Sequence, residues 1–265
     1  MRVARLILSV SISSLLSIIV AAQQTGTSST QALLLLQRSL SALAGGQAIS
    51  DVTLSGTAHR IAGSDDDTGT AVLKALASGA SRMDLTLSSG QRSEIRTLSA
   101  ATPAGAWSGP DGISHEMVFH NLLAGSSWFF PTFPVAKGLS PTGYAAAYVG
   151  REAHNGLAVE HLSVSQIFPV SANSGGTSFQ HLSQVDFFLD LTTLLPSSIS
   201  FNIHPDDNAL LDIPIEVRFS DYRYVNGAQI PFHIQKYLNN SLTLDFQAQS
   251  VTLNSGLTAT AFSAQ

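Results

Sequence analysis

The sequence predicts a mainly β fold with packed helices (β-rich α+β), built on one twisted antiparallel sheet of about 9–12 strands. Three observations lead to this prediction. Segments of alternating apolar and polar residues recur about every 10 residues, with turn residues between them. One amphipathic helix precedes these segments. Hydrophobic residues make up 44% of the 265 residues, which is enough for one large core.

The first 22 residues have the pattern of an export signal. Arg2 and Arg5 supply positive charge, residues 6–20 are apolar and uncharged, and a Val-Ala-Ala sequence offers the small residues that signal peptidase requires. The apolar run is shorter than the roughly 20 residues of a membrane span. We therefore expect residues 1–22 to be a cleaved signal peptide and residues 23–265 to form a single domain. An uncleaved N-terminal anchor is the alternative.

The one convincing amphipathic helix is predicted over residues 32–44. Thr30 is its expected N-cap, and the glycine pair at 45–46 ends it. Its leucines recur at helical spacing and form one apolar stripe. We expect this stripe to pack on the concave face of the sheet rather than against a partner protein. The stripe consists of Leu33, Leu36, Leu40 and Leu43.

The remaining chain has the texture of an antiparallel meander. Acidic and glycine residues at 63–69 predict a turn, and a glycine pair predicts a loop at 171–178. Asn226-Gly227 is the strongest hairpin signal in the chain. Pro231 lies inside a predicted strand, which indicates an edge strand or a bulge. The predicted strands are residues 52–58, 70–77, 81–88, 93–98, 145–149, 157–166, 185–191, 197–203, 215–225, 228–238 and 241–253.

The middle of the chain, residues 103–144, is rich in glycine, proline and aromatic residues, and we expect it to be an insertion into the sheet. A short helix is predicted over 113–124. The aromatic segment that follows has two interpretations: a buried plug between sheet and helix, or the lining and gate of an apolar pocket, hinged at Gly125 and Gly138. The candidate ligand-binding residues are Met117, Leu122, Trp128, Phe129, Phe130 and Phe133.

Composition and charge exclude several classes of function. The chain has a net charge of −5, and two of its 13 basic residues lie in the leader, so no basic surface is expected to bind nucleic acid. Cysteine is absent, which excludes disulfides, thiol nucleophiles and thiolate metal sites. A Cys-free exported chain is more typical of a bacterial periplasm than of the extracellular space, which is the second choice.

Few motifs suggest chemistry. His115 and His120 flank a glutamate but are spaced i+5, whereas a zinc-protease helix needs i+4. Asp65–Asp67 resemble part of a calcium loop without its downstream acid. Asp206-Asp207 predicts a turn, with a catalytic carboxylate pair as the alternative. We therefore expect no catalytic residues, no metal and no cofactor.

Several short motifs resemble the periplasmic lipoprotein-carrier superfamily, the LolA-like and outer-membrane lipoprotein-sorting proteins. They are Val52–Gly56 after the capped helix, Tyr224–Pro231 before the penultimate strand, and Leu253-Asn254 after the last one. The resemblance implies a curved antiparallel half-barrel with helices on its concave face and an apolar space between them. It also implies a buried arginine that binds the lid, for which the candidates are Arg60, Arg82 and Arg96.

The expected function is that of an exported, soluble carrier of a hydrophobic small molecule or an acyl chain. Three features favour it: low charge, clustered aromatics and the family resemblance. The resemblance also implies transient contact with membrane proteins. Two alternatives from other classes remain: an exported hydrolase with dispersed residues around His204 or His233, and a structural or partner-binding periplasmic protein.

Overall fold

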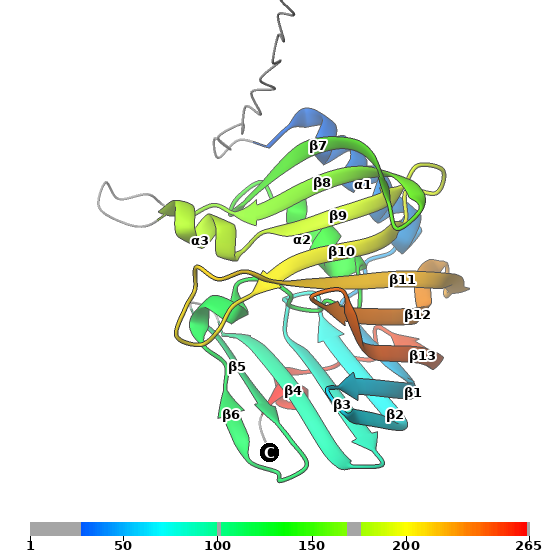
Figure 1. The fold of residues 1–265 in the computed structure, drawn as a ribbon. Helices are drawn as coiled ribbons and strands as arrows, with labels where there is room; N and C mark the ends of the chain where they lie inside the picture. The colour runs from blue at the N-terminus through cyan, green and yellow to red at the C-terminus, as the bar shows by residue number, and fades with distance from the viewer. Residues whose placement is uncertain (1–27, 100–101, 169–175, 264–265) are drawn as a thin grey trace, which may run out of the picture.

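A computed structural model describes residues 28–99, 102–168 and 176–263, so the predicted signal peptide lies outside the described residues. The fold is one curved, unclosed antiparallel sheet of 13 strands with few helices (Figure 1). The strands are β1 (Asp51–Ala62), β2 (Asp65–Leu76), β3 (Ser81–Leu87), β4 (Gly90–Ser99), β5 (Thr102–Ser108), β6 (Ser114–Glu116), β7 (Tyr144–His154), β8 (Leu157–Gln166), β9 (Val185–Asp190), β10 (Pro196–Ile203), β11 (Ile213–Val225), β12 (Ala228–Leu238) and β13 (Ser241–Leu253). The helices are α1 (Thr30–Ala44), α2 (Thr132–Gly138) and α3 (Gly176–Leu182), with short 3-10 helices η1 (Phe119–Leu122) and η2 (Ala259–Phe262).

The mainly β fold class is confirmed, but the sheet has more strands than the expected 9–12. The two strands that have no counterpart among the eleven predicted ranges are β5 and β6, which the glycine and proline content of the middle segment hid from the sequence pattern. The predicted helix at 113–124 is wrong. This stretch forms the three-residue strand β6 and then η1, because Ser114–Glu116 pair with β5.

The sheet consists of two meanders joined by their ends. The strand order is β6-β5-β4-β3-β2-β1-β13-β12-β11-β10-β9-β8-β7, so β1 pairs with β13 in the centre, and β6 and β7 are the two edges. The chain between these edges, residues 117–143, must therefore pass from one end of the sheet to the other. It carries η1 and α2 across the concave face, and its aromatic residues from Trp128 to Phe133 belong to the same core as the strands.

Helix α1 packs on the concave face, as predicted, against α2, β7 and β12. Leu36 and Leu43 of the predicted stripe are fully buried in the core. The N-cap is Ser29 rather than Thr30, since the Ser29 side chain accepts a hydrogen bond from the backbone N–H of Ala32. Gly45 ends the helix in the left-handed region, with φ +60°, next to the backbone of Gly227.

The predicted hairpin at Asn226-Gly227 joins β11 and β12, and both residues have positive φ (49° and 87°). Pro231 lies in β12, which is a central strand, so an edge position is wrong. A bulge at Pro231 is not found either, because the register with β11 is the same on both sides of the pair Tyr222–Pro231. The register shift of β12 lies further along the strand, between Lys236 and Tyr237 on the β13 side. The predicted turn at 63–69 is shorter than expected, since Asp65–Asp67 already belong to β2.

Within the described ranges, none of the helices combines the length and the apolar character needed to cross a bilayer.

Candidate functional site

The aromatic segment lies in the core beneath the concave face. Trp128, Phe129, Phe130 and Phe133 are each at most 4% exposed. Their rings contact one another edge to face, Trp128 with Phe129 at 5.5 Å and Phe130 with Phe133 at 4.7 Å between centroids. This burial fits the interpretation of the segment as a plug between sheet and helix. A direct role in ligand binding stays a prediction.

The other two candidate ligand residues, Met117 and Leu122, lie at the β5 end of the crossing segment. Together with Phe119 they line a cavity of about 530 Å³ beside the edge of the sheet. Gly105 of β5 allows this approach, because a Cβ there would be 2.6 Å from Leu122 Cδ2 and 2.9 Å from Met117 Sδ. The structure therefore separates the six candidates into two groups, four in the core and two at this edge.

One of the three candidate arginines holds the crossing segment in place. Arg96 of β4 is buried, and its Nη1 donates to the carbonyl oxygens of Asn121 and Ala124, each at 2.9 Å. Arg82 instead pairs with Asp84 on the outer face of β3, and Arg60 lies near the aspartates of β2. Of the three candidates, Arg96 is the one that is buried and bonded to the crossing segment, and its role as a lid-binding arginine stays a prediction.

A group of charges borders the inner side of the aromatic segment. Arg96 Nε donates to Glu94 Oε1 at 2.9 Å, and Lys236 Nζ lies 4.5 Å from the centre of the Trp128 ring. Burial alone would raise the pKa of Glu94, but Lys236 and Arg96 outweigh it and lower that pKa. Burial lowers the pKa of Lys236, although Glu94 opposes the shift. These charges point into the concave side, where an all-apolar lining was expected.

An open groove lies next to these charges on the inner face of the sheet. It has a volume of about 290 Å³, and its lining comes from strands that are far apart in the strand order, β3 at one side and β10 at the other. Only the curvature of the sheet brings these strands together. The lining is mainly aliphatic, with two cationic residues. It consists of Arg60, Ile61, Ala62, Met83, Leu85, Ile203, Ile215, Lys236, Leu238, Thr243 and Leu244.

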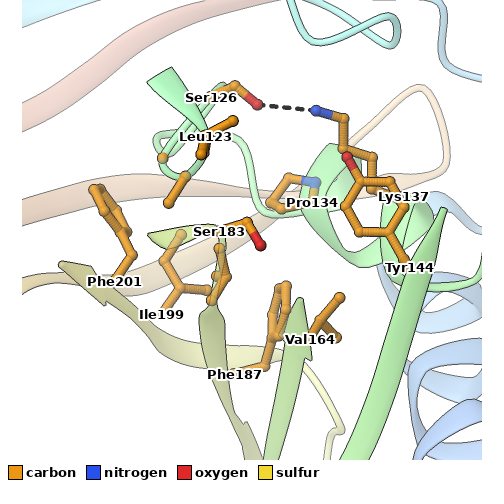
Figure 2. A pocket seen from close by; sticks show the side chains of 13 residues that line it. Leu123, Ser126, Pro134, Lys137, Tyr144, Val164, Ser183, Phe187, Ile199 and Phe201 are labelled. Carbon is orange, nitrogen blue, oxygen red and sulfur yellow. Dashed lines mark hydrogen bonds between the residues drawn. The ribbon is translucent and has the colours of Figure 1, made fainter. Parts of the chain in front are cut away.

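A smaller cavity of about 30 Å³ lies between α2 and strands β7–β10 (Figure 2). Phe187, Ile199 and Phe201 form its apolar wall, and Lys137 donates to Ser126 Oγ at 3.1 Å across its opposite side. Burial lowers the pKa of Lys137. Gly125 contributes to the lining, and its φ of +71° and its contact with the Phe201 ring leave no room for a side chain. This cavity is too small for an acyl chain unless the crossing segment moves.

The sequence motifs that suggested chemistry are separated by the fold. His115 stacks on Trp107 at 4.3 Å between ring centroids, whereas the His120 Nε2 lies 3.1 Å from the carbonyl oxygen of Pro205. His115 and His120 therefore do not converge on one metal ion. Asp206 and Asp207 lie in the predicted turn after β10.

A polar row on the outer face of the sheet had no sequence signature. Ser220 Oγ lies 3.1 Å from His233 Nδ1, and His233 Nε2 lies 3.0 Å from Asp245 Oδ1. The three residues stand side by side on β11, β12 and β13, on the face away from the helices. They match the residue types of a hydrolytic triad, but the serine is exposed on an extended strand.

The groove residues were also missed by the sequence analysis. Met83, Leu85 and Leu244 are ordinary apolar residues of alternating strands, so nothing distinguishes them from core. The only usable signal is charge at inward positions, where Arg60, Glu94 and Lys236 interrupt the apolar alternation. Here these interruptions lie where the aromatic segment borders the groove.

Comparison with proteins of known structure identifies the fold. No family model matches the sequence, and no curated protein matches it. Among solved structures, a putative outer membrane lipoprotein-sorting protein domain from Vibrio parahaemolyticus has a TM-score of 0.52 at 14% identity, covering 88% of this chain and 96% of that one. A LolA superfamily protein from Nitrosomonas europaea has a TM-score of 0.53 at 12% identity, covering 88% and 97%. The predicted resemblance is thereby confirmed at the level of architecture: this chain has the curved-sheet fold of the LolA-like proteins.

Proposed function

We propose that this chain is an exported, soluble, non-catalytic carrier that binds a lipid or the acyl chain of a lipoprotein. The observation that carries the proposal is the groove of about 290 Å³ between β3 and β10, which is mainly aliphatic and open on the concave face. Small-molecule pockets measure roughly 300–1,000 Å³, so the groove is near the lower end of that range. A folded protein normally covers such a surface unless a ligand does.

The energetics suit an extended apolar ligand. Each methylene transferred from water to such a groove contributes about 0.8 kcal/mol. About ten methylenes contribute about 8 kcal/mol, which equals micromolar affinity before the cost of association. A chain of about 15 methylenes contributes about 12 kcal/mol and reaches that affinity against an association cost of about 4 kcal/mol. Arg60 and Lys236 stand at the groove among aliphatic side chains. We propose that they face the anionic end of the ligand while the aliphatic residues cover its chain.

The proposed location is the bacterial periplasm, with the extracellular space as the alternative. The leader pattern of residues 1–22 supports export. The Vibrio parahaemolyticus relative in fold is described as a lipoprotein-sorting domain, which supports a ligand passed between membranes and transient contact with membrane proteins. Nucleic acid is not a proposed partner, because the net charge is negative.

A hydrolase is the competing function, and the row of Ser220, His233 and Asp245 is the observation that would favour it. The row lies on the outer face, away from the groove and the cavity beneath α2. A hydrolytic site needs a water-excluding pocket and preorganised donors for the oxyanion, and the backbone donors of central strands are used by the sheet. We propose that Ser220→Ala leaves the rate of ester hydrolysis, measured with short and long acyl esters, unchanged.

Titration with a fluorescent acyl probe tests the carrier function. Met83→Trp places a large ring in the groove, and we expect it to weaken probe binding at least about tenfold, the loss of about two buried methylenes. Gln247→Trp is the matched control, since residue 247 is exposed on the outer face of β13. Equal binding by both variants, or an empty protein that ignores added fatty acids, would overturn the proposal.

A further inference from the structure

Three side chains from separate segments meet beside the end of β10. His181 belongs to α3, His204 follows β10, and Asp212 precedes β11. Asp212 Oδ1 lies 2.9 Å from His181 Nε2 and 3.0 Å from His204 Nε2. One donor atom from each residue lies within 4.8 Å of the other two. Two imidazole nitrogens and a carboxylate oxygen thus converge on one point.

The surrounding structure fixes this arrangement in advance. Asn121 binds the backbone of His204 in both directions: its Nδ2 donates to the carbonyl oxygen and its Oδ1 accepts from the N–H, each at 2.8 Å. The side chain of His204 is completely buried, and its Nδ1 has no hydrogen-bond partner among the described residues. The ring of His120 lies 5.8 Å from that of His204. A third imidazole is therefore within one side-chain movement of the cluster.

The electrostatics of His204 and Asp212 favour the protonation states that a metal ion needs. Burial lowers the pKa of His204 despite its hydrogen bond to Asp212, which keeps the ring unprotonated. Burial alone would raise the pKa of Asp212, but its hydrogen bonds with His181 and His204 lower that pKa instead. Metal ions bind neutral imidazole and ionised carboxylate.

We propose that His181, His204 and Asp212 form a binding site for a divalent transition-metal ion of the zinc class, with His120 as a further ligand. Imidazole with a single carboxylate suits zinc and its neighbours, whereas calcium and magnesium require mostly oxygen ligands. Zinc bonds of about 2.0–2.1 Å place neighbouring ligand atoms about 3.3 Å apart in a tetrahedron. The two distances to Asp212 Oδ1 are close to this value, so the ion enters with small side-chain shifts.

The position of the site gives it a structural consequence. Leu123, Ser183 and Phe201 line the cavity beneath α2. Each of them lies two or three residues along the chain from one of the histidines, His120, His181 and His204 respectively. An ion bound here ties the crossing segment, α3 and β10 together at the rim of that cavity. The proposal does not depend on what the groove binds.

Cobalt titration of metal-stripped protein without a polyhistidine tag tests the site. We expect one equivalent of Co²⁺ to give the visible absorption of a tetrahedral nitrogen–oxygen site, and Zn²⁺ to displace it. His181→Ala and Asp212→Asn, both at partly exposed positions, should each weaken binding at least about tenfold, since even supporting contacts are worth that much at metal sites.

His233→Ala is the matched control, because it removes a histidine from another His–Asp pair and should bind Co²⁺ within about twofold of the wild type. Far-ultraviolet circular dichroism of each variant shows that the fold is retained. The proposal is overturned if the wild type shows no saturable binding. It is also overturned if His181→Ala and Asp212→Asn bind as tightly as the wild type, since the ion then sits elsewhere.

Discussion

The two ends of the sheet present different inner faces. At the β7–β10 end, the inward side chains Leu162, Phe187 and Ile199 are at most 1% exposed beneath the helices and the crossing segment. At the β3–β6 end, the inward positions include Arg92 and Glu94, and Trp107 is 46% exposed. One continuous sheet therefore has a fully covered end and an end that is only partly covered, which we call the uncovered end.

The difference follows from topology. The segment that joins the two edges carries its bulky residues, Trp128 to Phe133, toward the β7 side and covers that end. At the other end η1 contacts β5, and Arg96 binds the carbonyl oxygens of Asn121 and Ala124. The groove lies where coverage ends. One sheet thus carries both a buried core and an open apolar groove.

The largest expected effect compares a side chain at the covered end with one at the uncovered end. Phe130→Ala should lower the free energy of unfolding by about 3–5 kcal/mol, because the ring is fully buried and its cavity cannot collapse. Met83→Ala in the groove should cost about 1 kcal/mol or less. Guanidinium unfolding followed by circular dichroism measures both. Equal losses would mean that the two ends are equally packed.

The charges at the uncovered end provide the second test. Glu94→Gln should cost about 3 kcal/mol at neutral pH, because it leaves Lys236 and Arg96 without their buried counter-charge. The folded protein lowers the pKa of Glu94 below its ordinary 4.5, so this contribution is present above that pH and is lost as the pH falls further.

The difference in stability between wild type and Glu94→Gln should therefore shrink below about pH 4.5. Lys236→Met, which removes one counter-charge and retains the stem over Trp128, serves as the comparison. A difference that stays constant from pH 7 to pH 3 would show that the carboxylate charge has no part in it.

The third test concerns the glycine at which the crossing segment meets the covered end. Gly125→Ala should cost about 1–3 kcal/mol, because φ is +71° and the new Cβ would be 2.5 Å from Phe201 Cε2. Gly112→Ala is the matched control, with φ +72° and open space around it. The difference between the stability lost in Gly125→Ala and that lost in Gly112→Ala measures the cost of the contact with the Phe201 ring. If the two variants are equally stable, Phe201 moves freely and the cavity wall is soft.

The strands were largely predictable because their turns carry clear chemistry. The bounds of β8, β12 and β13 agree with the sequence pattern, and Asn226-Gly227 forms the predicted hairpin. The helix at 113–124 is wrong because pairing with β5 overrides a weak local preference. Pro231 lies in a central strand, but the described ladder with β13 begins only at His233, so at residue 231 the strand is paired with β11 alone. No local sequence pattern shows where that ladder begins.

The sites were much less predictable than the strands. The aromatic segment is unusual in sequence, but whether it is plug or pocket depends on the crossing from β6 to β7, which no local pattern encodes. The groove combines strands β3 and β10 through curvature alone. His181, His204 and Asp212 have no motif spacing, since three separate segments supply them.

The central claim is that the acyl chain lies in the groove on the inner face between β3 and β10, and site-directed quenching tests it most directly. The chain contains no cysteine, so Met83→Cys and Gln247→Cys each accept a single nitroxide label, one in the groove and one on the outer face. We predict strong quenching of a bound fluorescent fatty acid by the label at residue 83 and little by the label at residue 247. Equal quenching at the two positions, or a probe that remains bright at both, would contradict the account.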